Sequence, residues 1–186
     1  MRGLVAVAGV LLVLAVPAKA EFNYSYASLS YGNVDFDDLN VDGDGLGAEL
    51  SLAVAEEFHL FGRLEASDLD SSVDLTRWSA GIGYNTSLSP VLDVLARVTY
   101  EKIELDTPIG DADSDGFGIG VGIRVAATSL IEINGGVSYV DFDDGGDNTN
   151  VEAGVLFNLT ETISLGVNAT FDDDVNVYRL AGRFYF

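Results

Sequence analysis

Charged side chains recur at alternate positions within otherwise apolar segments of this 186-residue chain. Successive side chains of a β-strand point to opposite faces, so charges spaced in this way share one face of a sheet. A charge that is buried away from water persists only when it is paired. The pattern therefore predicts an interior network of ion pairs, with a charge-lined pore as the alternative. The predicted network consists of Glu49, Glu65, Asp93, Glu101, Glu132, Glu152, Arg63, Arg77, Arg97, Arg124, Arg179 and Arg183.

Hydrolytic chemistry has few candidate residues in this chain. There is one histidine, His59, and no cysteine. A Ser-His or His-Asp pairing would have to use this single imidazole, which follows directly after a short polar link at residues 55–57. We expect a turn-adjacent or interface residue rather than a general base, and therefore a protein that is not an enzyme.

Aspartates at alternate positions raise the question of cation binding. Residues 111–116, Asp-Ala-Asp-Ser-Asp-Gly, match the first half of a calcium loop, and residues 40–45 nearly do. An EF-hand also needs a bidentate glutamate at position twelve, where Gly122 and Ser51 stand. An EF-hand is therefore excluded, and no dedicated cofactor is expected. Weak calcium or magnesium binding stays open beside a simply solvated acidic rim, with Asp42, Asp44, Asp111, Asp113 and Asp115 as candidate ligands.

These residues are distributed over a chain that repeats a unit of about 30 residues, as successive hairpins do. Short polar links alternate with longer acidic links between the apolar segments. Ten such segments predict an all-β fold, an antiparallel up-and-down barrel of ten strands, with eight strands as the alternative. The predicted strands span residues 22–32, 44–54, 58–67, 75–86, 91–104, 115–126, 130–141, 149–158, 163–171 and 176–186.

The apolar row of each strand could face either of two solvents. A membrane barrel turns it outward to lipid, whereas a soluble lipocalin-like barrel turns it inward. The apolar rows contain no charge, Lys102 is the one lysine after residue 20, and aromatic residues gather at strand ends, where a membrane interface favours them. The sequence therefore predicts a transmembrane barrel. In the first strand Tyr24, Tyr26, Leu29 and Tyr31 change phase, which predicts a β-bulge.

The N-terminus has the pattern of an export signal. Met1 and Arg2 form a short basic start, residues 3–16 are apolar, and residues 17–20 end in a small-x-small motif. The apolar run is shorter than the roughly 20 residues that span a bilayer. We predict a signal peptide over residues 1–20, cleaved after Ala20, and a barrel domain over residues 21–186.

The charge of the chain limits its partners. The net charge is −21, and loss of Arg2 and Lys19 with the signal leaves −23 (7 − 30). Nucleic acid is excluded as a partner because phosphate binding needs clustered lysine and arginine. Outer-membrane barrels keep short turns in the periplasm and longer loops outside. We therefore expect a monomer of the bacterial outer membrane whose acidic links face the medium.

Three segments carry a family resemblance. Residues 57–63 (EFHLFGR), 78–85 (WSAGIGYN) and 89–102 (SPVLDVLARVTYEK) resemble a family of small bacterial outer-membrane β-barrel proteins, some of which carry a quorum-sensing or plant-immunity label. The terminal aromatic residue fits the broader class that includes OmpA- and OmpX-like barrels. The resemblance implies that periplasmic chaperones and the barrel-assembly machinery recognise the last strand, through Tyr178, Leu180, Phe184 and Phe186.

Three functions are consistent with these observations. The first is a structural, surface-exposed barrel whose acidic links interact with outer-membrane lipid, with lipopolysaccharide phosphates through bridging calcium or magnesium ions, or with external partners. The second is a narrow porin-like channel of low conductance. The third is an adhesion or signalling surface.

Overall fold

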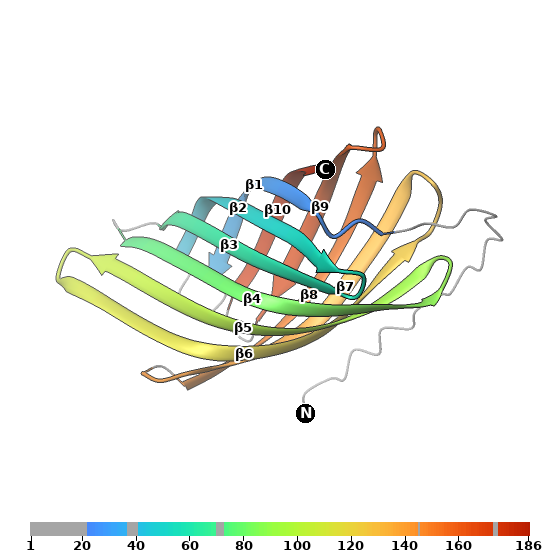
Figure 1. The fold of residues 1–186 in the computed structure, drawn as a ribbon. Helices are drawn as coiled ribbons and strands as arrows, with labels where there is room; N and C mark the ends of the chain where they lie inside the picture. The colour runs from blue at the N-terminus through green and yellow to red at the C-terminus, as the bar shows by residue number, and fades with distance from the viewer. Residues whose placement is uncertain (1–21, 37–40, 70–72, 145, 173–174) are drawn as a thin grey trace, which may run out of the picture.

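The structure, a computed structural model, describes residues 22–36, 41–69, 73–144, 146–172 and 175–186. Within these residues the chain forms a closed antiparallel up-and-down β-barrel of ten strands (Figure 1). The predicted fold is therefore confirmed, and the alternative of eight strands is wrong. The strands are β1 (Tyr26–Phe36), β2 (Val41–Ala55), β3 (Phe58–Leu69), β4 (Val73–Ser89), β5 (Leu92–Thr107), β6 (Gly110–Ala126), β7 (Ile131–Phe142), β8 (Gly146–Asn158), β9 (Ile163–Phe171) and β10 (Val175–Tyr185).

Pairing of β1 with β10 closes the barrel. The two strands run antiparallel in unbroken register from Tyr26 opposite Tyr185 to Phe36 opposite Val175. Every strand thus has two hydrogen-bonded neighbours, which matters because a bilayer cannot solvate a free sheet edge. No helix among the described residues is long and apolar enough to cross a membrane. The predicted signal peptide, residues 1–20, lies outside the described residues.

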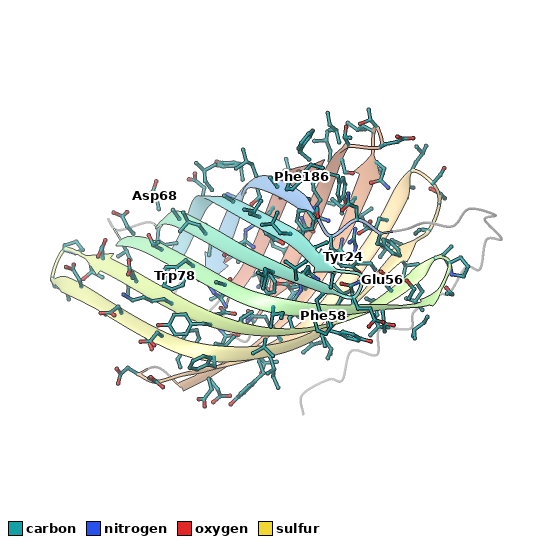
Figure 2. All side chains as sticks on the ribbon, in the orientation of Figure 1. Tyr24, Glu56, Phe58, Asp68, Trp78 and Phe186 are labelled. Atoms are coloured by element: carbon teal, nitrogen blue, oxygen red, sulfur yellow. The ribbon has the colours of Figure 1, made fainter. Side chains whose placement is uncertain are left out.

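Aliphatic and aromatic side chains cover the middle of the outer surface. In β6, for example, Ile119 and Val121 are each 64% exposed, while Gly120 between them faces the lumen. Trp78 lies on the same outer surface (Figure 2). The predicted orientation of the apolar rows is therefore confirmed in these strands.

The predicted bulge in β1 is wrong. The strand pairs with both neighbours without a register shift. Tyr24 and Tyr26 are buried inside the barrel, whereas Leu29 and Tyr31 are exposed on the outside. The change of phase in the sequence arises because the first two tyrosines occupy the inner face while the later apolar residues occupy the outer face. The backbone itself stays regular.

The strands extend further at their loop ends than the sequence indicated. Asp111 and Asp113 lie within β6 and Asp42 within β2, so these residues form strand, and Asp44 and Asp115 lie inside β2 and β6 rather than at their first position. The hairpin of β5 and β6 continues to a tight turn at 107–110 (Figure 1). Pro108 presets this turn and Gly110 completes it with a φ of 148°, which L side chains rarely adopt. The charge of the alternating aspartates masks their strand period of two in the sequence.

The two faces exchange character beyond the membrane region. At the loop ends the outward positions become acidic, while the inward positions become aliphatic, as Leu69, Leu75 and Leu105 show. This is the arrangement of a water-soluble sheet, with polar side chains out and apolar side chains in. We call the outward-facing acids the acidic ring: Asp35, Asp42, Asp44, Asp68, Asp74, Glu104, Asp106, Asp111, Asp113, Asp115, Asp141 and Asp147.

An aromatic belt lies directly below the acidic ring. Tyr31 donates a hydrogen bond to Asp44 over 3.2 Å, and Tyr100 donates one to Asp115 over 2.9 Å. The Tyr100 ring also contacts the Trp78 ring at a centroid distance of 5.4 Å. Amphipathic rings of this kind mark the boundary between hydrocarbon and water. The members of the belt are Tyr31, Trp78, Tyr100, Phe117, Tyr139, Phe171 and Tyr178.

The most tightly packed part of the lumen lies at the short-turn end. Inward-facing side chains there are each at most 9% exposed. His59 stacks on Tyr24 at a ring-centroid distance of 4.9 Å, and Gly83 makes room for the imidazole from the opposite position of β4. We call this group the short-turn plug: Tyr24, His59, Phe61, Asp93, Leu95, Arg124, Glu132, Leu156 and Tyr185.

Gly83→Ala should destabilise the barrel, because an added Cβ would lie 2.2 Å from two atoms of the His59 ring. Overpacking of this kind costs roughly 1–3 kcal/mol. The check is the urea midpoint for loss of the folded band on unboiled gels. The control is Gly62→Ala on the outer face, whose Cβ would meet nothing closer than 3.7 Å. Equal midpoints for the two variants would contradict the packing of His59 against Gly83.

Candidate functional site

The charged lumen is the candidate functional site. Each predicted network residue lies on the inward row of its strand, in line with the lumen-facing positions around it. The structure brings these residues together from strands that are distant in the sequence. Charges occur at the middle of the barrel and again within the short-turn plug.

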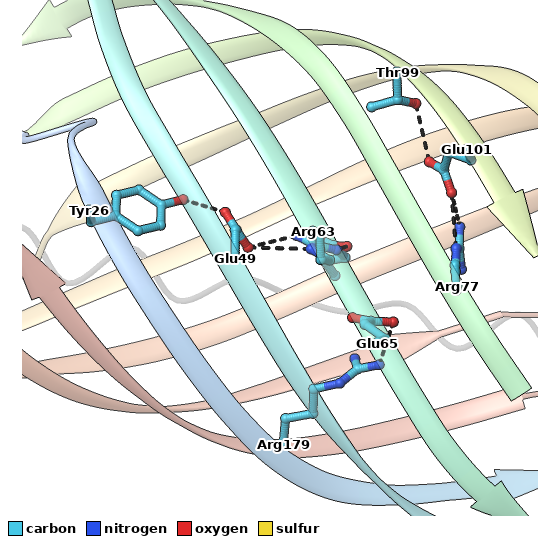
Figure 3. A network of polar contacts seen from close by, with 9 residues as sticks. Tyr26, Glu49, Arg63, Glu65, Arg77, Thr99, Glu101 and Arg179 are labelled. Carbon is cyan, nitrogen blue, oxygen red and sulfur yellow. Dashed lines mark hydrogen bonds and ion pairs between the residues drawn. The ribbon is translucent and has the colours of Figure 1, made fainter.

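Arg63 is the centre of the middle group. Its Nη2 lies 3.2 Å from the carboxylate of Glu49, and its Nη1 lies 3.4 Å from the carboxylate of Glu152. Tyr26 donates a further hydrogen bond to Glu49 (Figure 3). One guanidinium therefore joins β2, β3 and β8 across the lumen.

Two further pairs extend this group. Nε of Arg77 donates to Glu101 over 2.9 Å, and Thr99 donates to the other oxygen of that carboxylate over 3.1 Å (Figure 3). Arg179 pairs with Glu65 over 2.9 Å and links β10 to β3. We call the whole set the central ion-pair layer: Glu49, Arg63, Glu65, Arg77, Glu101, Glu152 and Arg179.

A separate ion pair lies in the short-turn plug. Arg124 donates to both oxygens of Glu132, over 2.7 and 2.9 Å, and both side chains are almost completely buried. Asp93 instead accepts hydrogen bonds from Tyr24 over 2.8 Å and from Ser87 over 2.6 Å. These contacts provide hydrogen-bond partners for the buried charged groups without water. They also join the aromatic packing of the plug to the barrel wall.

Arg97 and Arg183 are arranged differently. Within the described residues no carboxylate lies within 4.0 Å of either guanidinium, and the buried Nε of each has no hydrogen-bond partner. Each guanidinium lies over an aromatic ring: Arg97 is 5.0 Å from the Phe61 centroid, and Arg183 is 4.0 Å from the Tyr26 centroid. Cation–π attraction holds both groups, and their positive charge remains available inside the lumen.

The central ion-pair layer lies between two cavities. The inner cavity, of about 200 Å³, extends toward the short-turn plug and is lined by Arg97, Arg183 and Asn134. The outer chamber, of about 340 Å³, lies toward the loop ends and is lined by Leu75, Leu105 and Asn148, among others. Arg63, Glu65, Glu101, Glu152 and Arg179 border both cavities.

The candidate cation ligands do not gather in one place. Asp113 lies 3.4 Å from the ammonium of Lys102, and Asp115 accepts the hydrogen bond from Tyr100. Asp111 stands opposite Asp106 across the β5–β6 ladder. No three acidic or histidine side chains come together as a metal site anywhere in the described part of the chain.

His59 lies inside the barrel rather than at the interface with lipid. It is 1% exposed, and its Nδ1 is 3.1 Å from the Oδ1 of Asn85. Its Nε2 has no hydrogen-bond partner among the described residues. The contacts of the ring are those of a packing residue in the plug.

Sequence reasoning missed the apolar half of the lumen. Phe61 occupies the same inward row as Arg63 in β3, and Leu95 the same row as Arg97 in β5. Tyr24 lies two residues before the start of β1 and is buried inside the barrel like Tyr26. Counting in twos from Arg63 and Arg97 finds Phe61 and Leu95. The inward row of β1 carries no charge, so the same rule does not reach Tyr24 and Tyr26.

Sequence comparison identifies the family. A family model described as outer membrane protein beta-barrel domain matches residues 5–171. The chain therefore belongs to this family of outer-membrane β-barrels, and its location is the bacterial outer membrane. A search of curated protein sequences finds no significant match.

Solved structures share the barrel fold. The NanC porin is 8% identical with a TM-score of 0.55, over 86% of this chain and 100% of that chain. The β domain of the Bordetella autotransporter BrkA is 10% identical with a TM-score of 0.52, over 89% and 100%. A KdgM porin is 12% identical with a TM-score of 0.48, over 86% and 99%. The NanC and BrkA barrels, whose TM-scores exceed 0.5, indicate a shared fold and nothing further.

Arg124→Ala should destabilise the barrel by roughly 3–5 kcal/mol, because it leaves Glu132 buried without its partner. The double variant Arg124→Met with Glu132→Met should recover much of this loss, since no unpaired charge remains. Urea titration of the folded band measures both. Lys102→Met, which breaks a pair on the outer surface, should have little effect. A single variant no weaker than the double variant would contradict the paired arrangement.

Proposed function

We propose that this barrel acts at the outer face of the outer membrane, where its acidic ring binds lipopolysaccharide through bridging divalent cations. The observation that carries this proposal is the position of the ring. Its carboxylates point outward from the strand ends, immediately above the aromatic belt. The belt marks the membrane interface, so the ring lies at the height of the phosphate groups of neighbouring lipids.

Electrostatics give the cations their role in this proposal. Carboxylates and phosphates repel each other unless a cation lies between them, and calcium and magnesium prefer oxygen ligands. The described residues hold no group of three acids that could form a site by themselves. The carboxylates of the acidic ring are spread out, so a divalent cation that is coordinated by one carboxylate together with lipid phosphates fits them better than a cation coordinated by the protein alone.

The packing of the lumen supports a structural barrel over an open pore. The short-turn plug fills the lumen with side chains that are almost completely buried, as is common in small barrels. Neither the single histidine nor the ion pairs provide an exposed nucleophile and base in contact. We therefore infer a non-enzymatic barrel whose interactions take place at its outer surface, and we propose that it is a monomer.

In vesicles that contain lipopolysaccharide, chelation with EDTA should lower the thermal midpoint of the folded band by a few degrees, and added calcium should restore it. EDTA should have no effect in phosphatidylcholine vesicles. Asp68→Asn with Asp141→Asn should reduce the response, whereas Glu56→Gln with Glu161→Gln, at the short-turn end, should not (Figure 2 shows Asp68 and Glu56 at opposite ends). A midpoint that is the same across the calcium titration would refute the bridging role.

A narrow channel is the second candidate, and the two arginines without a carboxylate partner favour it. Arg97 and Arg183 place positive charge that no carboxylate contacts beside the inner cavity. Planar-bilayer recordings should then show small anion-selective steps, and Arg97→Gln should reduce that selectivity. The matched control is Lys102→Gln on the outer surface, which should leave the steps unchanged. A wild-type barrel that produces no steps would remove this candidate and leave the surface function standing.

A further inference from the structure

The outer chamber has two chemically different walls. Leu69, Leu75, Ile103 and Leu105 line it from β3, β4 and β5. Asn148 and Asn150 line it from β8, Thr170 from β9, and Asp172 from directly after that strand. Val34, Val175 and Val177 add to the lining from β1 and β10. In a closed ring of ten strands β3 and β4 lie opposite β8 and β9, so the aliphatic wall faces the polar wall across the lumen.

Among the described residues, the side chains around the aliphatic wall pack less tightly than those of the short-turn plug. The four members of the wall are each partly exposed, whereas the inward residues of the plug are buried. An apolar surface inside a water-accessible chamber favours an apolar occupant. The volume of about 340 Å³ lies at the small end of the range for ligand pockets.

The polar wall offers an acceptor. Asn148 donates through Nδ2 to the carboxylate of Asp172, and this fixes the amide. Its Oδ1 is buried and has no hydrogen-bond partner among the described residues. A buried acceptor left without a donor is costly, so this position calls for an N–H or O–H group on an occupant.

The charges around the outer chamber decide whether the donor group of an occupant is cationic or anionic. The chamber is lined by three arginines and four carboxylates: Arg63, Arg77, Arg179, Glu65, Glu101, Glu152 and Asp172. The three arginines pair with Glu152, Glu101 and Glu65 in the central ion-pair layer, so these charges cancel, and the acidic ring surrounds the same end of the barrel. A cation is therefore attracted to this end of the barrel and an anion is repelled.

We propose that the outer chamber binds a small cationic amphiphile, a primary amine with an aliphatic body. The ammonium group donates to the Oδ1 of Asn148 beside Asp172, and the aliphatic body lies against Leu75, Ile103 and Leu105. Each added methylene that contacts this wall tightens binding about fourfold. The site is independent of the lipid-binding role of the acidic ring, because its residues face inward.

Cysteine protection tests the site in the folded barrel in phospholipid bilayer discs. The chain contains no cysteine, so Ile103→Cys introduces a single thiol into the aliphatic wall. n-Hexylamine should slow its reaction with a water-soluble methanethiosulfonate reagent at least several-fold and saturably, and n-hexanol should do so far less. Thr149→Cys, on the exposed outer side of β8, should react at the same rate with and without the amine.

Asn148→Leu separates a specific site from partition into lipid. Loss of the Oδ1 acceptor should raise the half-protecting concentration of n-hexylamine about tenfold. The matched control is Asn134→Leu in the inner cavity, which should leave that concentration unchanged. Equal protection by amine and alcohol, equal slowing of the thiol at position 149, or no effect of Asn148→Leu would overturn the proposal. So would a thiol at position 103 that never reacts, since the chamber would then be closed to water.

Discussion

The whole structure depends on the requirement that no backbone hydrogen-bonding group be left unpaired in hydrocarbon. Lipid offers no donors or acceptors, so a sheet that crosses it must close on itself. The continuous ladder between β1 and β10 meets this requirement. Closure then sets the environment of each side chain, because each strand presents one row to lipid and the other to a lumen of limited width.

A narrow lumen forces polar groups to satisfy one another. Ten strands leave room for side chains and two modest cavities. Arg63 therefore reaches carboxylates on two other strands, and Arg124 binds Glu132 through two hydrogen bonds. Arg97 and Arg183, which no carboxylate of the described residues contacts, lie over aromatic rings instead. The interior combines ion pairs with the aromatic and aliphatic packing of a globular core.

The change of solvent along the barrel axis explains its two ends. The alternation of side chains continues beyond the aromatic belt, but water replaces lipid outside. Acids can then occupy the outer row, and aliphatic residues such as Leu75 and Leu105 can occupy the inner row. The same backbone pattern thus produces a lipid-facing apolar band, an acidic ring and an outer chamber. These last two features are the surfaces on which a partner or ligand can act.

The sequence alone determined the fold, because a period of two and the even succession of ten segments are local properties of the chain. It also placed the charged residues of the network in the lumen. It did not reveal that Arg97 and Arg183 lack carboxylate partners, since pairing joins strands such as β3 and β8 whose relation depends on register around the closed ring. The plug around His59 and the two-walled outer chamber were likewise decided by the tertiary structure, because only closure sets opposite strands face to face.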